Sequence, residues 1–285
     1  MSISYQRQLT AVFGDPVDDN PTVVMEQAAF DAEEIPMDYL TIQVKQGDIA
    51  AAITGMRAMN FTGANITMPH KGEVLKYLDQ VSDVAKIMGA VNTLYWKEGK
   101  LTGENTDGKG FLETLKHAGV GLCGKHVTIL GAGGAARAIA VELAFAGAAQ
   151  ITVLNHSEEH GKTLTEILEK HTETKADYLP WTAGVKIPAG TDILVNATPI
   201  GFMDDARPDI DYSTMTDGMI VCDVIPNKAW TPFLLEARKK NLQTFNGLSM
   251  LVNQGAIAYE LWTGRKAPLA VMQRAMEQAY GVKLP

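Results

Sequence analysis

A glycine-rich segment near the middle of the chain constrains the fold more than any other feature. It covers residues 131–136, with the sequence GAGGAA, and stands between the apolar run 126–130 and a stretch of helical periodicity that extends to about Ala146. A strand, a glycine loop and a helix in this order are typical of a βαβ unit that binds a dinucleotide. We therefore expect a Rossmann-like fold in this part of the chain.

The residues of this loop have distinct roles in such a fold. Gly131 permits the tight turn, Gly133 lets the backbone approach a pyrophosphate, and Ala135 or Ala136 permits close packing of the helix on the sheet. The first N–H groups of the helix are donors for the anion. The alternative is a loop that serves packing alone. We predict cofactor contacts from Gly131, Ala132, Gly133, Gly134 and Ala135.

The next predicted strand ends in Asn155-His156-Ser157-Glu158, where the ribose of the cofactor should bind. This segment lacks both the acid at the strand tip that NAD sites often have and an arginine for a 2′-phosphate. Glu158 can accept hydrogen bonds from ribose hydroxyls and would repel a phosphate, whereas His156 and Ser157 could contact one. The sequence therefore favours NAD over NADP. Alternatively, Glu158 and Glu159 only complement the dipole of the following helix.

Strands and helices alternate along most of the chain, which predicts an α/β protein. At 285 residues it is long enough for two domains. Two runs, 92–96 and 100–103, form a hairpin turned at Glu98-Gly99, and Thr106 then begins a helix as N-cap. We expect an N-terminal αβ domain with a parallel-type sheet and a second, Rossmann-like domain. The other predicted strands are 9–13, 39–44, 64–67, 126–130, 150–154, 193–195 and 219–223, and the predicted helices begin near 22, 47, 133, 158, 248 and 269.

Charge and composition exclude several classes of protein. The net charge of −8 argues against a nucleic-acid footprint, and no run approaches the roughly 18 apolar residues of a membrane span, so we expect a cytoplasmic protein without a membrane partner. Cys123 and Cys222 are too few for a disulfide framework or a cysteine metal site. His156 and His160 have helical metal-ligand spacing without a third ligand nearby, so we predict no metal.

Two polar segments in the first half carry the candidate chemistry. The first, 65–71, reads NITMPHK and ends in Lys71, and the second, 104–108, reads ENTDG and contains Asp107. A lysine and a carboxylate beside small hydrogen-bonding side chains can move a proton on a polyhydroxylated small molecule. Proton chemistry beside a dinucleotide site is typical of an alcohol or ketone oxidoreductase.

Six segments together resemble the shikimate dehydrogenases and the related quinate/shikimate dehydrogenases. This resemblance implies a substrate-binding domain built from residues 1–106 with 247–285, a cofactor domain at 107–246, a cleft between them, and reversible hydride transfer between NAD or NADP and a ring hydroxyl. It implies a hydroxylated ring carboxylate as substrate, and a homodimer is one possible assembly. The segments are Asn65-x-Thr67-x-Pro69-x-Lys71, Gly89-Ala90-Val91-Asn92-Thr93, Asn105-Thr106-Asp107-Gly108, residues 131–136, Asn196-Ala197-Thr198-Pro199-x-Gly201, and Gly247-Leu248-x-Met250-Leu251-Val252-x-Gln254.

The resemblance also assigns roles to individual residues. Lys71 and Asp107 resemble the catalytic pair, and Thr198 belongs to a segment of the cofactor site. Asn92, Gln254 and Thr67 resemble substrate ligands, since amides donate and accept hydrogen bonds together. The alternative for Lys71 is an exposed lysine at a helix start, and for Asp107 an acid in the first turn of a helix. The alternative for Asn92 is a cap at a strand end, and for Gln254 a surface helix residue.

The chain departs from the family pattern at two places. The family's Ser-x-Ser-Pro segment, which holds the substrate carboxylate, is replaced by a segment that puts Asn20 and Thr22 at the serine positions, unless it is only a turn and a cap. Pro226 stands where a tyrosine would line the nicotinamide side. Both changes weaken the case for strict shikimate specificity. The alternatives are a divergent relative acting on another hydroxylated ring acid and a non-catalytic cofactor- or metabolite-binding protein.

Overall fold

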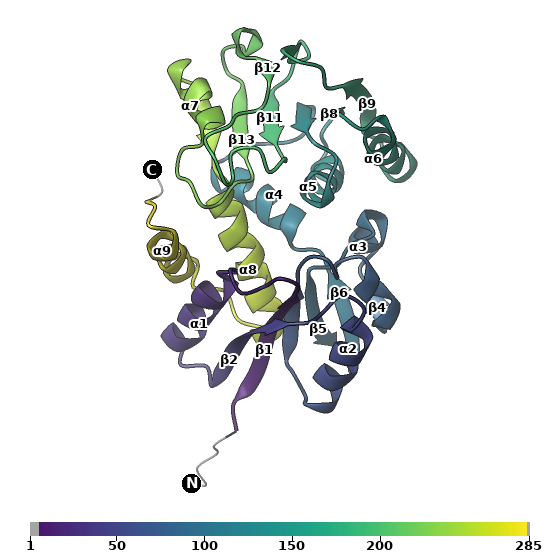
Figure 1. Ribbon diagram of the computed structural model, residues 1–285, viewed down its shortest axis with the longest axis vertical. Coiled ribbons are helices and arrows are strands. Elements are labelled where there is room, and N and C mark those ends of the chain that lie inside the picture. The colour runs from purple at the N-terminus through teal and green to yellow at the C-terminus, as the bar shows by residue number, and fades with distance from the viewer. Residues whose placement is uncertain (1–5, 284–285) are drawn as a thin grey trace. The chain divides into compact units, whose positions relative to one another are not determined.

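The computed structural model describes residues 6–283, and in it the chain divides into two compact units (Figure 1). One unit consists of residues 6–106 with Gln254–Gly281, and the other mainly of Asp107–Asn253. Each unit has its own six-stranded sheet, so the two-domain α/β class is confirmed. The chain returns to the first unit inside a helix, at Gln254, whereas we expected the boundary at residue 247. The assignment of one unit to the substrate and the other to the cofactor stays a prediction.

The first unit carries a mixed sheet in the order β2-β1-β3-β5-β6-β4. Strand β1 pairs in parallel with β2 and β3, and β5 runs antiparallel to both β3 and β6. Its strands are β1 (Gln8–Gly14), β2 (Met37–Gln43), β3 (Gly63–Ile66), β4 (Gln80–Val81), β5 (Thr93–Lys97) and β6 (Lys100–Glu104). Its helices are α1 (Thr22–Ala32), α2 (Ile49–Ala58), the 3-10 helix η1 (Glu73–Tyr77), α3 (Asp83–Met88), the C-terminal part of α8 (Gly247–Thr263) and α9 (Leu269–Tyr280).

This sheet is mixed rather than parallel throughout because of the β5–β6 hairpin. Its turn residues, Glu98 and Gly99, have φ angles of 52° and 74°, the left-handed conformations that a tight two-residue hairpin requires. The hairpin brings Asn92, which precedes β5, next to Glu104, the last residue of β6: Asn92 N donates to Glu104 O at 3.0 Å. The predicted hairpin is confirmed, and it places two polar segments side by side.

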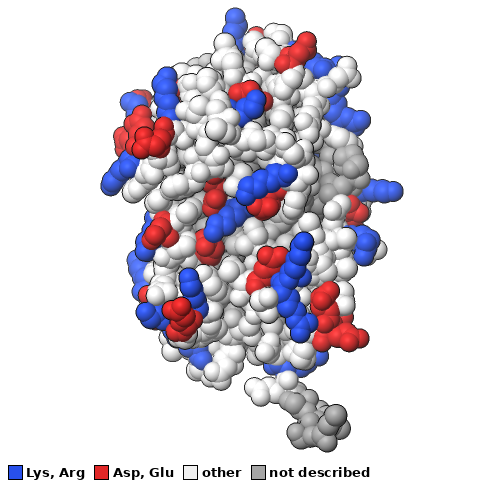
Figure 2. Space-filling view, turned by 180° about the vertical axis from the view of Figure 1, so that it is seen from behind, with Lys and Arg blue, Asp and Glu red and all other residues white. Residues whose placement is uncertain are grey.

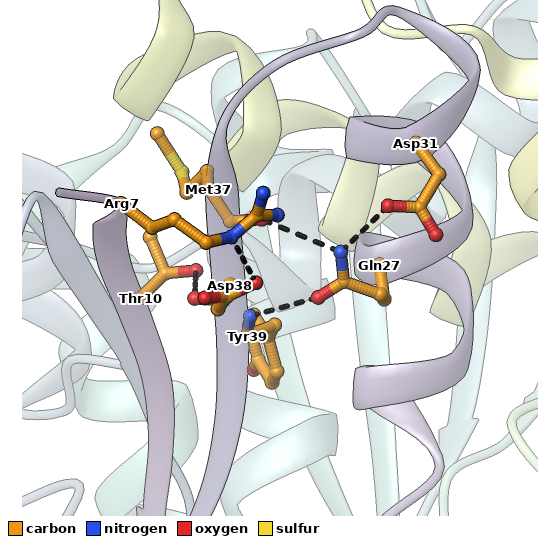
Figure 3. A network of polar contacts seen from close by, with 7 residues as sticks. All are labelled: Arg7, Thr10, Gln27, Asp31, Met37, Asp38 and Tyr39. Carbon is orange, nitrogen blue, oxygen red and sulfur yellow. Dashed lines mark hydrogen bonds and ion pairs between the residues drawn. The ribbon is translucent and has the colours of Figure 1, made fainter. Parts of the chain in front are cut away.

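Polar contacts fix how α1 sits on the sheet (Figure 3). Gln27 Oε1 accepts from Tyr39 N at 3.1 Å, and Gln27 Nε2 donates to Met37 O and to Asp31 Oδ1 at 3.3 and 2.9 Å. On the outer side, Arg7 pairs with Asp38 at 2.7 Å. The face of α1 that carries Gln27 is therefore held against β2, which sets the direction of every other side chain on this helix.

The second unit is built on a fully parallel sheet in the order β14-β13-β11-β7-β8-β9. Its main strands are β7 (His126–Leu130), β8 (Gln150–Asn155), β9 (Lys175–Pro180), β11 (Ile193–Asn196), β13 (Ile220–Asp223) and β14 (Gln243–Phe245), with a small two-stranded sheet of β10 (Val185–Lys186) and β12 (Ile210–Asp211). Its helices are α4 (Asp107–His117), α5 (Gly134–Phe145), α6 (Glu158–His171), the 3-10 helix η2 (Tyr212–Thr214), α7 (Pro232–Lys239) and the N-terminal part of α8.

The order of these strands reverses at β7, which pairs with β8 on one side and β11 on the other. In register, Leu130 lies between Leu154 and Asn196, so the loops that follow the three strands emerge at one edge. Open parallel sheets bind ligands at such a reversal, outside the carboxyl ends of the strands. The glycine loop after β7 is therefore at the expected place.

Each unit has its own buried apolar core. In the first unit the cluster joins residues of the sheet to α2, including Phe13, Ile53 and Leu94. In the second, Leu130, Leu194, Val221 and Phe233 belong to a cluster between the sheet and α7. Two separate cores explain how each unit can hold its own site in place.

The described residues contain no helix that is both long and apolar enough to span a membrane. On the face drawn in Figure 2, lysine and arginine alternate with aspartate and glutamate and form no continuous basic field. This distribution agrees with the acidic net charge of −8 and gives a polyanion no extended surface on that face.

Candidate functional site

The first unit contains a buried polar network centred on Asn92, which lies directly before β5. Its Oδ1 accepts from Thr106 N at 2.7 Å, and its Nδ2 donates to Thr106 Oγ1 at 3.0 Å and to Gln254 Oε1 at 3.4 Å. Thr106 Oγ1 also lies 3.4 Å from Gln254 Oε1. Asn92 and Gln254, predicted as substrate ligands, are therefore brought together by the fold, although 162 positions separate them.

The network continues through β3 to β2. Asn65 donates through Nδ2 to Asn92 O at 3.2 Å and to Thr93 Oγ1 at 3.1 Å, while its Oδ1 accepts from Tyr39 Oη at 2.7 Å. All these side chains are buried, and hydrogen bonds in such surroundings hold amide groups in one orientation. Tyr39 and Thr93 were not predicted, because nothing in the sequence pairs them with Asn65.

Lys71 and Thr67 lie in the segment that follows β3, next to this network. Thr67 N donates to Phe13 O at 2.9 Å, and Lys71 O accepts from Val91 N at 2.8 Å. His70 is fully buried between them, with its Nε2 2.6 Å from Val44 O. The backbone of this segment is therefore tied to β1 and to the residue before Asn92, which places Lys71 at the edge of the polar network.

Asp107 begins α4 and follows Thr106 directly. α4 packs closely on α5: a Cβ atom added at Gly108 would lie 2.2 Å from Ala138 O, so only glycine fits there. This contact fixes the start of α4, and with it Asp107, on the helix that follows the glycine loop. Thr106, the predicted N-cap, uses its hydroxyl in the network around Asn92.

Asn20 and Thr22 form the turn into α1. Asn20 Oδ1 accepts from Thr22 N at 3.0 Å, so the side chain of Asn20 already binds the first N–H of the helix. Thr22 is 5% exposed and Asn20 is half-buried. An N–H group that would otherwise be a donor for an anion is therefore satisfied within the chain.

The glycine loop of the second unit divides into a structural half and an open half. Gly131 has φ +104°, and a Cβ atom there would lie 3.0 Å from Thr198 Cγ2. At Gly133 and Gly134 an added Cβ would meet nothing within 4 Å. Gly133 is the N-cap of α5, and within the described part of the chain no side chain caps the first N–H groups of this helix. The loop therefore fits a pyrophosphate.

The residues that we predict beside the ribose, 155–158, run from the end of β8 to the start of α6. His156 stacks on Trp181, with ring centroids 4.8 Å apart and planes 12° from parallel, and its Nδ1 lies 3.0 Å from Trp181 O. Ser157 caps α6, and Asn155 Nδ2 donates to Ser157 O at 2.9 Å. Trp181 is 25 residues away along the chain, and its stacking on His156 was not predicted.

The charge of Glu158 is partly compensated. Its carboxylate lies 2.6 Å from Lys162 Nζ, one helical turn on, and this contact lowers the pKa of Glu158 and raises that of Lys162. Both side chains are exposed, so solvent screens the pair. The negative charge that we expected to repel a 2′-phosphate is present, but a cation lies beside it.

Thr198, after β11, belongs to a third group of polar residues. Its hydroxyl donates to Asn196 Oδ1 at 2.7 Å and accepts from Ile200 N at 3.2 Å. Asn196 Nδ2 in turn donates to Asp223 Oδ1 at 3.0 Å, and Thr231 Oγ1 donates to Asp223 Oδ2 at 2.6 Å. Burial raises the pKa of Asp223 to about 6 despite these bonds. This carboxyl group holds the loops after β11 and β13, including the segment with Pro226.

No group of three histidine, cysteine, aspartate or glutamate side chains in residues 6–283 has the arrangement of a metal site. The absence of a metal stays a prediction. The features described so far define a class of protein: two α/β units, one with a buried cluster of amides and hydroxyls, the other with a parallel sheet and an open glycine loop at its reversal point.

Comparison with known proteins identifies the family. Three family profiles match: the shikimate dehydrogenase substrate binding domain over residues 12–94, shikimate/quinate 5-dehydrogenase over 113–200, and the shikimate 5′-dehydrogenase C-terminal domain over 247–277. The shikimate dehydrogenase (NADP(+)) of Desulforamulus reducens is 38% identical over 281 residues, which cover 97% of each chain. The chain therefore belongs to the shikimate dehydrogenase family, a family of oxidoreductases that act on CH–OH groups.

Two solved structures show how closely the fold agrees. The ligand-free 5-ketofructose reductase of Gluconobacter sp. strain CHM43 is 44% identical, with a TM-score of 0.94 over 97% of this chain and 100% of that one. The shikimate 5-dehydrogenase of Listeria monocytogenes, in complex with shikimate and NAD, is 31% identical, with a TM-score of 0.89 over 96% and 98%. The names of these two proteins give different substrates, although both share the fold of this chain.

Proposed function

We propose that the protein is an NAD(P)-dependent oxidoreductase that interconverts a hydroxyl group and a ketone on shikimate or quinate, with 3-dehydroshikimate or 3-dehydroquinate as the other partner. The observation that carries this proposal is the network of Asn65, Asn92, Thr106 and Gln254, which offers oriented amides and hydroxyls to a polyhydroxylated molecule. Membership in the family supports the reaction type.

In this proposal Lys71 and Asp107 handle the proton. A nicotinamide cofactor whose pyrophosphate is held by the glycine loop would supply or accept the hydride. As a ketone is reduced, Lys71 donates a proton to the carbonyl oxygen, and Asp107 favours the charged form of the lysine and orients it. In the reverse direction Lys71 accepts the hydroxyl proton. Asn92, Gln254 and Thr67 orient the substrate through its other hydroxyl groups, and Thr198 helps to hold the cofactor.

A second candidate substrate is a neutral polyhydroxylated ketone such as 5-ketofructose. Two observations favour it: the 44% identity to a 5-ketofructose reductase, and the bond between Asn20 Oδ1 and Thr22 N. That bond occupies a backbone donor at the place where the family resemblance puts the substrate carboxylate. A substrate without a carboxylate has no need of this donor.

For the cofactor we propose a modest preference for NAD. Glu158 places a negative charge beside the ribose position, and the segment 155–158 has no arginine. The curated relative named above carries NADP(+) in its name, whereas the Listeria structure contains NAD. The ion pair of Glu158 with Lys162 reduces the repulsion, so the preference should be small. Cytoplasmic location and a homodimer stay predictions.

Absorbance at the reduced-nicotinamide band tests these proposals. Shikimate and quinate are each offered with NAD and NADP, and 5-ketofructose with each reduced cofactor. Turnover of shikimate or quinate supports the first substrate, and turnover of 5-ketofructose alone supports the second. The absence of turnover with every combination, in protein that binds a nicotinamide cofactor, would support a relative that acts on another hydroxylated ring acid or a non-catalytic metabolite-binding protein instead.

A further inference from the structure

A carboxyl group without a partner is buried in the first unit. Glu26, on α1, is 0% exposed, and neither of its carboxylate oxygens has a hydrogen-bond partner among residues 6–283. Buried polar groups in folded proteins are nearly always hydrogen-bonded, and each exception calls for an explanation. None of the roles proposed above uses this residue.

The fold makes room for this group next to the predicted substrate site. A Cβ atom added at Gly255 would lie 2.3 Å from Met25 Cε and 2.8 Å from Glu26 Oε1, so both side chains of α1 pack against this glycine. Gly255 follows Gln254 on α8. Because neighbouring residues of a helix lie about 100° apart, the contact of Gln27 with β2 (Figure 3) turns Glu26 toward α8.

Thr22 and Glu26 lie on the same side of α1. They are four positions apart, about one helical turn, and both are buried. Thr22 begins the helix at the place where the family resemblance puts the substrate carboxylate. Glu26 therefore lies one helical turn after Thr22, about 6 Å further along the axis of α1.

The titratable neighbours of Glu26 come from the elements packed against α1. Tyr39 on β2 and Tyr259 on α8 both interact electrostatically with it, and burial raises the pKa of each tyrosine, so both stay neutral at physiological pH. Along α9, Tyr280 lies near Asp19, and burial raises its pKa to about 12. Burial also raises the pKa of Glu26 well above its usual range. The carboxyl group thus loses its proton at a higher pH than an exposed glutamate.

We propose that Glu26 sets the preference of the site for the charge of its substrate. Once ionised, its carboxylate weakens the binding of an anionic substrate at the start of α1, next to Thr22, and does not change the binding of a neutral polyhydroxylated ketone. This inference rests on the proposed function, because it places the substrate at the start of α1. At a separation of about 10 Å and an effective dielectric constant of about 20, the repulsion corresponds to roughly a tenfold increase in KM for an anion.

The test compares two substrates, two proteins and a range of pH. KM for shikimate, an anion, and for 5-ketofructose, a neutral ketone, is measured between pH 6 and 9 with saturating cofactor, in the unaltered protein and in Glu26→Gln. In the unaltered protein we expect the KM for shikimate, divided by the KM for 5-ketofructose, to rise about tenfold as pH increases. In Glu26→Gln we expect this ratio to stay constant. Glu34→Gln, which removes an exposed charge after the far end of α1, should behave like the unaltered protein.

Infrared spectroscopy adds a readout that does not depend on turnover. A protonated carboxyl band that disappears as pH rises in the unaltered protein, and is missing from Glu26→Gln, identifies the titrating group. Should Glu26→Gln fold poorly, Glu26→Met removes the charge at similar length and should give the same flat ratio.

Each outcome decides one of the two proposals. If the unaltered protein turns over none of shikimate, quinate and 5-ketofructose, the proposed function is wrong. If it turns over both shikimate and the ketone, and the KM ratio has the same pH dependence with and without Glu26, the inference alone is overturned. If it turns over only the ketone, a gain of shikimate turnover in Glu26→Gln supports the inference, and no gain overturns it. If it turns over only shikimate, a KM for shikimate that rises with pH in the unaltered protein and stays flat in Glu26→Gln supports the inference, and the same pH dependence in both proteins overturns it.

Discussion

Gly133 offers the sharpest test of the cofactor site, because the fold leaves its surroundings empty. A Cβ atom added there meets nothing within 4 Å, so Gly133→Val should still fold, at a cost of about 1 kcal/mol because valine is a poorer N-cap than glycine. The added methyl groups would occupy the space next to the uncapped start of α5, where a pyrophosphate accepts backbone hydrogen bonds. We therefore expect binding to be lost without unfolding.

The size of the effect follows from the number of bonds lost. A hydrogen bond to a charged group contributes about 1.5–3 kcal/mol, so the loss of one such bond weakens binding roughly 10- to 150-fold, and the loss of two weakens it further. The assay is a calorimetric titration of NADH and NADPH, with thermal unfolding followed by circular dichroism. Gly131→Ala is the matched control: with φ +104° and Thr198 3.0 Å away, it should lower the stability by about 1–2 kcal/mol or more.

The two glycines are thus expected to fail in different ways, one in binding and the other in stability. Unchanged affinity for both cofactors in folded Gly133→Val would show that the loop is structural and that the dinucleotide binds elsewhere. A large loss of stability in the same variant would show that the space beside Gly133 is not open.

Three further predictions concern the chemistry. Lys71→Ala and Asp107→Ala should each lower turnover by at least about 10²-fold while cofactor affinity stays within a few fold, and near-normal turnover of either variant rejects the proposed role. His156→Arg combined with Glu158→Gln should shift the ratio of kcat/KM toward NADP; a larger kcat/KM with NADP in the unaltered protein would contradict the proposed preference for NAD. The pKa of Asp223 is about 6 in the folded protein and 3.8 in its usual range, so the unfolded chain loses this proton at a lower pH than the folded one. The free energy of unfolding should therefore fall as pH rises from about 4, by about 3 kcal/mol at pH 7. Asp223→Asn should therefore gain in Tm relative to the unaltered protein between pH 4 and 7, and a difference independent of pH refutes this.

The local patterns of the chain were sufficient for much of the fold. The glycine loop, the hairpin at Glu98-Gly99 and helix α6 were all predicted, because each depends on a turn chemistry or a periodicity contained in a few consecutive residues. Helix α7 was missed, although Thr231 as cap and Pro232 in the first turn are recognisable start signals. Strand β14, with three residues, is too short to show a period.

The candidate site was less predictable, for a physical reason. Motifs supplied Asn92 and Gln254, but their contact depends on two distant parts of the chain meeting. Tyr39 beside Asn65, Trp181 under His156 and the buried Glu26 also depend on tertiary packing, and composition gives no sign of them. A buried glutamate in particular is contrary to the usual tendency of its residue type.

The first unit needs both ends of the chain, and this has a consequence for how the protein is made. Trp262 fills the notch at Gly63, where no Cβ would fit, and donates to Leu94 O at 2.9 Å, while Tyr259 stacks on Phe30. On the ribosome, residues 6–106 emerge before residues 254–281 and lack these partners until then. The second unit is nearly continuous in sequence, so it can complete its core while synthesis is still under way. The first unit can therefore complete its core only after residues 254–281 have been made, whereas the second unit depends on no segment beyond residue 253 for most of its contacts.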